Sequence, residues 1–313
     1  MFEIKRYEPS HEQAWNDFVA RSKNGTFLFD RRFMDYHSDR FADSSLIILR
    51  KGRIYALLPA NRVGDTLHSH QGLTYGGLLT DAKATAEGVM EAFGALNAWL
   101  RNEGVRRVTY KAMPWIYHRL PAEEDLYALT QVCHARLLTR EISSTILLQQ
   151  PLRFTESRKS GLRKALREGL YMEESGDLAA FWQMLDDNLA SRHHTHPVHS
   201  LDELHLLQRR FPQQIHLYLI YNKEKEPVGG TWVFDTGQVV HTQYIASTKE
   251  GKAHGALDLL FDELINRRYR EGIYLDFGKS TEEGGRVLNE HLIFQKEGFG
   301  GRGVCYDTYE WEP

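Results

Sequence analysis

Cysteine is scarce in this chain, and long apolar runs are missing from it. Only Cys133 and Cys305 occur among the 313 residues, too few for a disulfide framework or for a zinc site built from cysteine alone. No run approaches the roughly 18 apolar residues of a membrane-spanning helix. The first residues also lack the apolar segment of a secretory signal. These absences predict a cytoplasmic protein with no integral membrane segment.

Basic and acidic residues nearly balance. The chain has 39 Lys and Arg against 42 Asp and Glu, a net charge of -3 with His neutral. A balanced chain has no overall field that draws it to DNA or to an anionic membrane, so we predict no DNA partner and leave a peripheral membrane contact open through local patches. The composition, 42% hydrophobic and 26% charged, is that of a globular protein, and the length favours two domains.

The order of predicted elements in the first half of the chain recurs in the second half. In each half a β-hairpin is followed by a long helix, a Glu-Gly pair and a strand. The glycines of the two pairs, Gly104 and Gly272, are 272 - 104 = 168 residues apart. Such self-similarity indicates a duplicated domain of roughly half the chain. The predicted hairpins cover residues 45–60 and 215–234, and the predicted helices cover 82–102 and 255–270.

Polar residues gather where one predicted strand of the second half ends. Residues 273–277 alternate into a strand that breaks at Gly278, and a helix is expected to begin at about Arg286. We predict that Asp276 orients substrate or accepts a proton. The alternative is a structural carboxylate that anchors the following loop. The predicted substrate-binding residues beside it are Lys279 and Ser280.

The preceding strand, residues 238–246, carries two further candidates. His241 and Tyr244 are three positions apart, so an unbroken strand directs them to opposite faces, and only one of them can point into a cleft. Both are predicted catalytic residues. The alternative for each is a place in the core or on a sheet face.

Four histidines lie within residues 193–199. No metal site is predicted, because no cysteine, acidic run or i,i+4 helical frame accompanies them, and Pro197 indicates a loop. We predict that this loop, with His194 and His196, forms the rim of a substrate site. A solvated loop is the alternative.

Residues 155–169 predict a basic helix that ends at Gly169. Arg158 and Arg163 belong to the charges that gather on one side of this helix, where they could bind a nucleotide diphosphate, a lipid phosphate or the backbone of tRNA. The alternative is an exposed basic face whose opposite, apolar side packs on the domain.

The order of strands and helices, with a helix ending in Gly298-Phe299, resembles the GNAT acyltransferase fold. Two copies joined by the basic helix Arg158-Lys159-x-x-Leu162-Arg163-Lys164-Ala165-x-x-x-Gly169 resemble the FemAB group, the tandem-GNAT aminoacyltransferases of peptidoglycan bridge synthesis. The resemblance implies an α/β (α+β layered) fold of two tandem GNAT-like domains, each a mixed twisted sheet flanked by helices. We place them at residues 1–150, on the acceptor side, and 151–313, with the donor cleft.

The resemblance also implies where a donor would bind. In GNAT enzymes acyl-CoA lies between two splayed strands, and its pyrophosphate meets amides at the start of the next helix. The matching loop, residues 248–253, has the family's small residues but lacks its leading Gln or Arg. A loop that carries lysines could still hold phosphate, so two alternatives stay open here, a CoA phosphate site and a solvated strand-to-helix turn. The implied cofactor-binding residues are Ile245, Ala246, Gly251, Lys252 and Gly255.

A second departure concerns the acid that protonates the leaving group. Many GNAT enzymes have a tyrosine four residues before the Gly-Phe pair, and Phe294 holds that position here. Phe294 cannot donate a proton, so either Tyr306 or Tyr244 serves, or the donor is not a thioester. Phe294 remains a predicted substrate-binding residue. Others in the first half are Arg31, Arg32 and Tyr75, of which the arginines match a region where FemAB proteins contact an anionic precursor.

These inferences together predict an N-acyltransferase. It would transfer an acyl or aminoacyl group, from acyl-CoA or aminoacyl-tRNA, to an amine of a cell-envelope or polysaccharide precursor. The expected partners are a small-molecule or nucleotide-linked precursor and, for an aminoacyl donor, tRNA; apart from acyl-CoA no cofactor is expected. The alternative is a catalytically silent GNAT-fold module that binds an anionic envelope precursor.

Overall fold

The computed structural model describes residues 1–193 and 196–313 and divides into two compact units. Unit 1 comprises Met1–Glu141, Thr281–Val287 and Cys305–Pro313, and unit 2 comprises Ile142–Ser280 and Leu288–Val304. The predicted division between residues 150 and 151 differs from these units, because the chain returns to unit 1 twice after entering unit 2.

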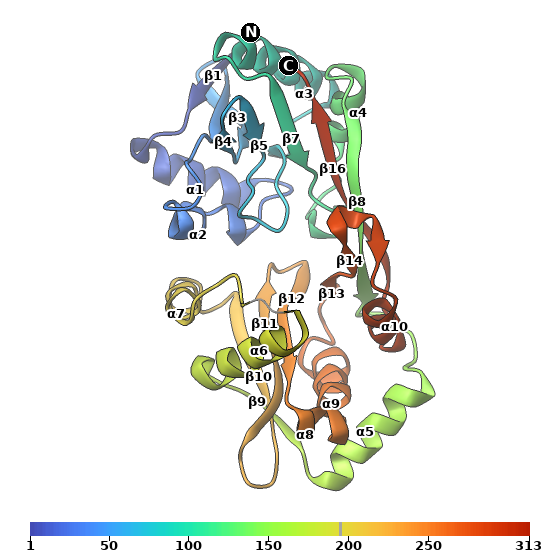
Figure 1. The fold of residues 1–313 in the computed structure, drawn as a ribbon. Helices are drawn as coiled ribbons and strands as arrows, with labels where there is room; N and C mark the ends of the chain where they lie inside the picture. Colours follow the sequence, from blue (N-terminus) through green and yellow to red (C-terminus); the bar gives the residue numbers. More distant parts are fainter. Residues whose placement is uncertain (194–195) are drawn as a thin grey trace. The chain divides into compact units, whose positions relative to one another are not determined.

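Unit 1 is built from two groups of strands and four α-helices (Figure 1). The first group is an antiparallel sheet in the order β1-β2-β3-β6, and the second has the order β4-β5-β7-β16-β8. The strands are β1 (Phe2–Arg6), β2 (Leu46–Arg50), β3 (Arg53–Leu58), β4 (Asn61–Val63), β5 (Thr66–His68), β6 (Leu79–Thr80), β7 (Arg107–Lys111), the part of β8 (Arg136–Leu147) up to Glu141 and the part of β16 (Arg302–Trp311) from Cys305 on. The α-helices are α1 (Glu12–Arg21), α2 (Arg31–Met34), α3 (Ala86–Asn102) and α4 (Glu124–Gln131), with 3₁₀ turns at Pro9–His11, Phe27–Phe29, Asp35–His37, Trp115–Tyr117 and Glu283–Gly285.

Helix α3 shows why the sequence pattern predicts this unit well. The hydroxyl of Thr85 accepts a hydrogen bond from the amide of Gly88 at 3.2 Å and caps the helix start. Apolar residues that recur every three to four positions are buried in a core shared with β2, β3 and β7. Gly104 then adopts φ +70°, a left-handed conformation in which glycine is favoured. The buried residues of the stripe are Val89, Phe93, Leu96 and Leu100.

Two glycines of this region give a stability prediction with a built-in control. A Cβ atom at Gly104 would meet no atom within 4 Å, but the positive φ disfavours alanine there, so Gly104→Ala should destabilise the chain by about 1 kcal/mol. Gly94 lies inside α3 and is equally open, so Gly94→Ala should stabilise it by up to about 1 kcal/mol. Urea unfolding of both variants measures this. Shifts of the same sign would contradict the prediction.

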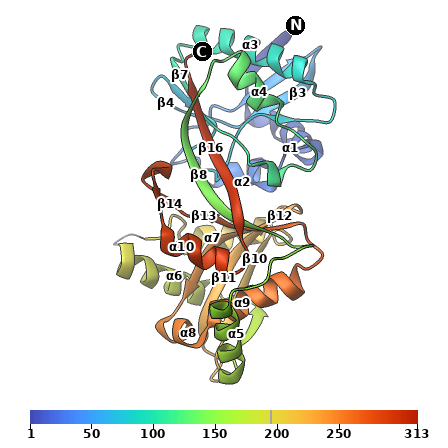
Figure 2. The ribbon, with the colours of Figure 1, turned by 90° about the vertical axis from the view of Figure 1, so that its right-hand side faces the viewer.

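Unit 2 is a sheet in the order β8-β13-β12-β11-β10-β9, in which β12 and β13 are parallel and the other neighbours antiparallel. Helices α5 and α9 lie side by side in both views, and α6 lies on the other side of the strands (Figure 2). The strands are the part of β8 (Arg136–Leu147) from Ile142 on, β9 (Tyr171–Glu174), β10 (Ile215–Tyr221), β11 (Pro227–Asp235), β12 (Val239–Ser247) and β13 (Tyr274–Lys279). The helices are α5 (Glu156–Glu168), α6 (Leu178–His193), α7 (Leu201–Arg210), α8 (Lys249–His254), α9 (Ala256–Glu263), a π-helical turn (Leu264–Arg268) and α10 (Glu290–Gly298).

Two predictions about helices have opposite outcomes. The basic helix is confirmed as α5, and Gly169 ends it with φ +73°. The helix expected from Arg286 is wrong at its start, because α10 begins only at Glu290. Residues before it form a two-stranded ribbon of β14 (Thr281–Glu282) and β15 (Val287–Leu288). Within the described residues no helix is both long and apolar enough to cross a membrane.

Candidate active site

The candidate site lies where β12 and β13 part. The two parallel strands pair only from Val239↔Tyr274 to His241↔Asp276, although both strands continue beyond these residues. Gly278 follows with φ +73°, a conformation that turns β13 out of the regular ladder. The expected splay between these strands is therefore present in unit 2.

A pocket of about 230 Å³ opens beside the parted strands. Its apolar side chains come from β12, α9, β13, α10 and the residue after α10, and its polar ones come from α6, β12, α8 and α10. The pocket is thus an apolar slot with a few polar groups, the usual character of a small-molecule site. The lining residues are Asn188, Ile245, Ala246, Ser247, Lys252, Leu257, Phe261, Phe277, Leu292, Gln295, Lys296 and Phe299.

Asp276 is fully buried at the last position where β13 pairs with β12. Its Oδ1 accepts hydrogen bonds from the hydroxyls of Ser143 and, at 2.8 Å, Thr145, and its Oδ2 lies 3.0 Å from Nδ1 of His241. A buried carboxylate needs such donors. The carboxylate therefore orients neighbouring side chains, and its burial disfavours the predicted direct contact with substrate.

His241 is the residue that this carboxylate orients. Its side chain is 10% exposed, and Asp276 accepts the Nδ1 proton. A carboxylate at Nδ1 fixes the tautomer, so any proton transfer by this ring takes place at Nε2. The structure thus joins two of the three predicted catalytic residues into one Asp-His pair at the fork of the strands.

Tyr244 lies further along β12 in a different group of rings. The register of β11 and β12 shifts between Thr242 and Tyr244, and this bulge breaks the alternation from which opposite faces were expected for His241 and Tyr244. The Tyr244 hydroxyl lies 2.6 Å from Nδ1 of His199, and its ring stacks on Trp232. Burial raises the pKa of Tyr244 to about 12.

The histidine loop is only partly described. His194 lies outside the described residues. His196 is exposed, with Nδ1 2.7 Å from Asp186 Oδ1, while His199 is buried against Tyr244. The sequence pattern predicted a functional role for this loop but could not show which of its histidines is buried. Within residues 1–193 and 196–313, no group of three or more His, Cys, Asp or Glu side chains is placed to hold a metal ion.

Lys296 is a site residue that the sequence did not reveal. It lines the pocket, is 5% exposed, and donates from Nζ to the carbonyls of Gly278 (2.8 Å) and Lys279 (2.9 Å) and to the hydroxyl of Ser280 (2.9 Å). Burial lowers the pKa of Lys296 to about 8, and the Asp276 carboxylate opposes this effect. In the sequence, Lys296 is a single lysine within a predicted helix. Lysine is ordinarily an exposed residue, so the pattern gave no sign of a site residue here.

The predicted residues Lys279, Ser280 and Phe294 have three different environments. Ser280 is fully buried, and its hydroxyl oxygen accepts a hydrogen bond from the Lys296 ammonium. Lys279 is exposed and contributes its carbonyl to the same ammonium. Phe294 is 68% exposed on α10, so its ring is available to a ligand at the surface rather than packed in the slot.

The implied cofactor loop is present as the turn from β12 into α8. Ile245, Ala246 and Lys252 line the pocket, and the Lys252 ammonium donates to Asn188 Oδ1 at 2.6 Å. At Gly251 and Gly255 the close approach of neighbouring backbone leaves no room for a side chain. A Cβ atom at Gly251 would lie 1.9 Å from the Val228 carbonyl oxygen, and one at Gly255 would lie 2.4 Å from the Gly161 carbonyl oxygen.

On α5 the two predicted arginines differ. Arg158 forms an ion pair with Asp258 at 3.0 Å and lies over the ring of Phe299. Burial raises the pKa of Asp258 to about 6, although Arg158 lowers it. Arg163 is exposed and lies 4.0 Å from Glu156. Arg158 thus links α5 to Asp258 of α9 and to Phe299, and Arg163 remains at the surface.

In unit 1 the predicted precursor-binding residues are largely occupied by protein contacts. Arg31 is 2% exposed, pairs with Asp35 and, at 3.0 Å, with Asp43, and lies 3.8 Å from the centre of the Tyr7 ring. This is the environment of a structural arginine. Two further residues were predicted: exposed Arg32 donates two hydrogen bonds to Asp30, and buried Tyr75 donates to Thr26 at 3.2 Å.

Comparison with known proteins agrees with this geometry. Residues 155–284 match the family model described as the acetyltransferase (GNAT) domain, so this segment of the chain carries a GNAT domain. No curated protein sequence matches the chain.

Solved structures extend the likeness to the whole chain. FemX superposes with a TM-score of 0.68 at 11% identity, covering 99% of this chain and 97% of FemX. The C-terminal domain of a putative lysylphosphatidylglycerol synthetase from Agrobacterium fabrum gives 0.63 at 12% identity, covering 96% and 91%. A tandem GNAT protein from the clavulanic acid biosynthesis pathway gives 0.52 at 12% identity, covering 100% and 98%. The chain therefore has the tandem GNAT fold.

The depressed pKa of Lys296 predicts how stability depends on pH. Between about 8, its folded value, and 10.5, its ordinary value, the unfolded chain holds more protons at this lysine than the folded chain. The free energy of unfolding should therefore rise with pH across this interval, by at most about 3 kcal/mol, and Lys296→Met should remove this rise. Urea unfolding below, within and above the interval measures the difference. Exposed Lys223→Met is the control, and parallel curves for wild type and Lys296→Met would refute the assignment.

Proposed function

We propose that this chain is an N-acyltransferase whose donor lies in the pocket between β12 and β13. The observation that carries the proposal is the splay itself, in which pairing stops at His241↔Asp276 and an apolar slot opens beyond it. A GNAT domain over residues 155–284 supports the same reaction class. Because a fold hosts many functions, the slot and the side chains around it support this reaction class more specifically than the fold does.

We favour acyl-CoA as the donor. The slot offers apolar walls from Ile245, Phe277 and Phe299 for an acyl or pantetheine chain. Lys252, in the last turn of α8, adds a cation to the lining of the slot, and a charge-assisted contact from it would favour a phosphate group of the donor. An aminoacyl group from tRNA is the alternative donor, since the loop lacks the leading Gln or Arg of the GNAT pattern.

The reaction needs a neutral amine and a path for its proton. In the proposed step the amine nitrogen bonds to the acyl carbonyl carbon, the carbon–sulfur bond of the thioester breaks, and the amine loses a proton. We assign His241 as the group that takes this proton and Asp276 as the residue that positions His241. Tyr244, whose pKa burial raises to about 12, keeps its proton at neutral pH and can return one to the leaving thiolate.

The proposed acceptor is an amine on a cell-envelope or polysaccharide precursor. Of the predicted substrate-binding residues, Arg163 and Phe294 are exposed on unit 2, and Arg32 is exposed on unit 1. The resemblance to the FemAB group supports this acceptor class.

A second candidate function is a catalytically silent module that binds an anionic precursor. One observation favours it: Phe294 occupies the position of the GNAT tyrosine and is 68% exposed, so no hydroxyl stands there to protonate a leaving group.

Acyl-CoA binding tests the donor site. Acetyl-CoA or longer acyl-CoAs should raise the melting temperature saturably, and Lys252→Ala should weaken binding about tenfold by removing a charge-assisted contact to phosphate. The control Lys223→Ala removes an exposed lysine of the same unit that does not line the pocket. If no acyl-CoA stabilises the wild type, the CoA form fails, and stabilisation by aminoacyl-tRNA would then support the aminoacyl form.

Turnover with an accepted amine tests the Asp-His pair. His241→Gln should lower kcat about 10²- to 10⁴-fold, the usual range for general acid–base catalysis, without weakening donor binding. Asp276→Asn should also lower kcat and shift its pH profile, because the amide no longer holds Nδ1 as a donor. Unchanged kcat in both variants would contradict the assignment. Loss of donor binding together with a lowered melting temperature would show that the pair is structural.

A further inference from the structure

Unit 1 contains a basic pocket that the proposed acyl transfer does not use. Its volume is about 880 Å³. Five cations and two carboxylates line it, a local charge of 5 - 2 = +3, opposite in sign to the -3 of the whole chain. The cations are Arg21, Arg50, Lys51, Arg53 and Lys83, and the carboxylates are Asp17 and Asp81. They come from α1, the β2–β3 hairpin and the loop after β6.

Most of this positive charge is not neutralised by the protein. Among the described residues, Arg50 has an acidic partner, Glu91 at 3.6 Å, and the other four cations form no ion pair. The two carboxylates are engaged locally: Asp17 accepts from the Gln13 amide at 2.8 Å, and Asp81 from the backbone amide of Lys83 at 2.9 Å. Like charges that converge without partners repel one another, and an anionic ligand would relieve that repulsion.

Aromatic rings hold two of the guanidinium groups. The Arg21 Cζ atom lies 4.7 Å from the centre of the Phe18 ring, and the Arg50 Cζ atom lies 5.2 Å from the Phe2 ring and 5.8 Å from the Tyr55 ring. Such contacts restrict the planar groups and reduce the entropy lost when a ligand binds. Planar guanidinium groups match the oxygen pairs of phosphate.

We infer that the basic pocket of unit 1 binds a ligand with more than one phosphate charge. Its charge of +3 exceeds what a single carboxylate would neutralise, and its three arginines favour phosphate oxygens. Either a soluble diphosphate or a phospholipid headgroup that ends in a phosphate monoester, as in phosphatidic acid, presents this chemistry. The inference does not depend on the proposed acyl transfer.

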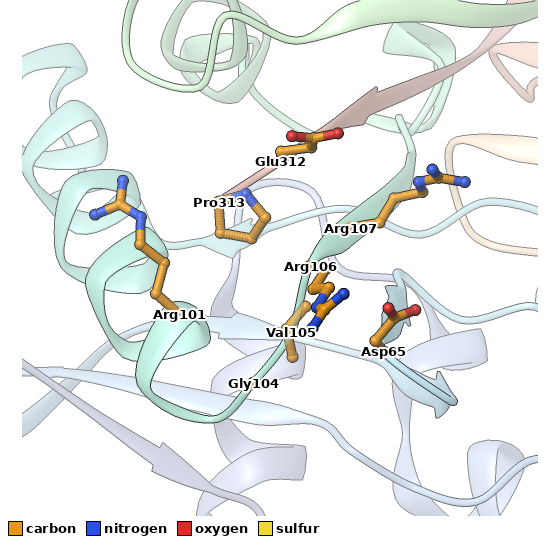
Figure 3. A pocket seen from close by; sticks show the side chains of 8 residues that line it. All are labelled: Asp65, Arg101, Gly104, Val105, Arg106, Arg107, Glu312 and Pro313. Carbon is orange, nitrogen blue, oxygen red and sulfur yellow. The ribbon is translucent and has the colours of Figure 1, made fainter.

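A second pocket of unit 1 provides the control (Figure 3). It measures about 620 Å³ and is lined by Arg101, Arg106 and Arg107 together with the carboxylates Asp65 and Glu312. In the view of Figure 3, Arg101 extends from α3 and Arg107 from β7, and their guanidinium groups point away from each other. Arg101→Gln therefore removes the same charge from the same unit outside the basic pocket.

Titration calorimetry with inorganic pyrophosphate at low salt tests the inference. Wild type should bind pyrophosphate, and affinity should fall as salt is added. Each of Arg21→Gln and Arg53→Gln should weaken binding about tenfold, and the double variant about 100-fold. Arg101→Gln should bind as wild type does. Because all three side chains are exposed, equal melting temperatures should show that the variants are folded.

Vesicles distinguish the two sources of phosphate. Binding to vesicles that contain phosphatidic acid but not to phosphatidylcholine vesicles, lost in the double variant, would identify a lipid headgroup. Pyrophosphate binding without vesicle binding would identify a soluble ligand. The inference is overturned if wild type binds neither probe, if the double variant binds as tightly as wild type, or if only an RNA oligonucleotide binds.

Discussion

The buried carboxylate of Asp276 is the group around which the candidate site of unit 2 is organised. It accepts hydrogen bonds from Ser143 and Thr145 on β8 and from His241 on β12. Three neighbouring strands are thus joined at one carboxylate, at the last position where β12 and β13 pair. An unpaired charge in that place would cost several kcal/mol, so the strands are held together there before they part.

Parting the strands creates a second requirement, which Lys296 meets. Beyond Asp276 the register of β13 on β8 shifts, and Gly278 takes a left-handed conformation. Carbonyl groups that leave a ladder need new donors. The ammonium of Lys296 donates to the carbonyls of Gly278 and Lys279. Its three protons match these two carbonyls and one hydroxyl, which explains why a lysine is buried at this position.

The sequence predicted the strands of this site better than its contacts. Alternation placed Asp276 at the end of a strand and His241 on the strand before it, and both lie where β12 and β13 part. Nothing in the pattern around Lys296 distinguishes it from an exposed helical lysine. The bulge between Thr242 and Tyr244 was invisible for a similar reason, because a single inserted residue leaves the composition of a strand unchanged.

The division into units was also beyond sequence patterns. A repeat of 168 residues suggests two consecutive copies, but it does not show that Thr281–Val287 and Cys305–Pro313 belong to unit 1. Segment exchange of this kind depends on contacts between distant parts of the chain. Periodicity reports only neighbours in sequence.

The arginines of unit 1 show why residue type alone is a weak guide to a binding site. Arg31 was predicted to bind substrate because it matches a precursor-binding region of FemAB proteins. In the structure, two carboxylates and an aromatic ring already surround its guanidinium group. Arg21 and Arg53 were not predicted as site residues. Both line one pocket, and among the described residues they form no ion pair. The contribution of a cation to the free energy of ligand binding depends on the ion-pair partners that the cation already has in the protein. Candidates for anion binding are therefore better ranked by the charge that the protein leaves uncompensated than by motif.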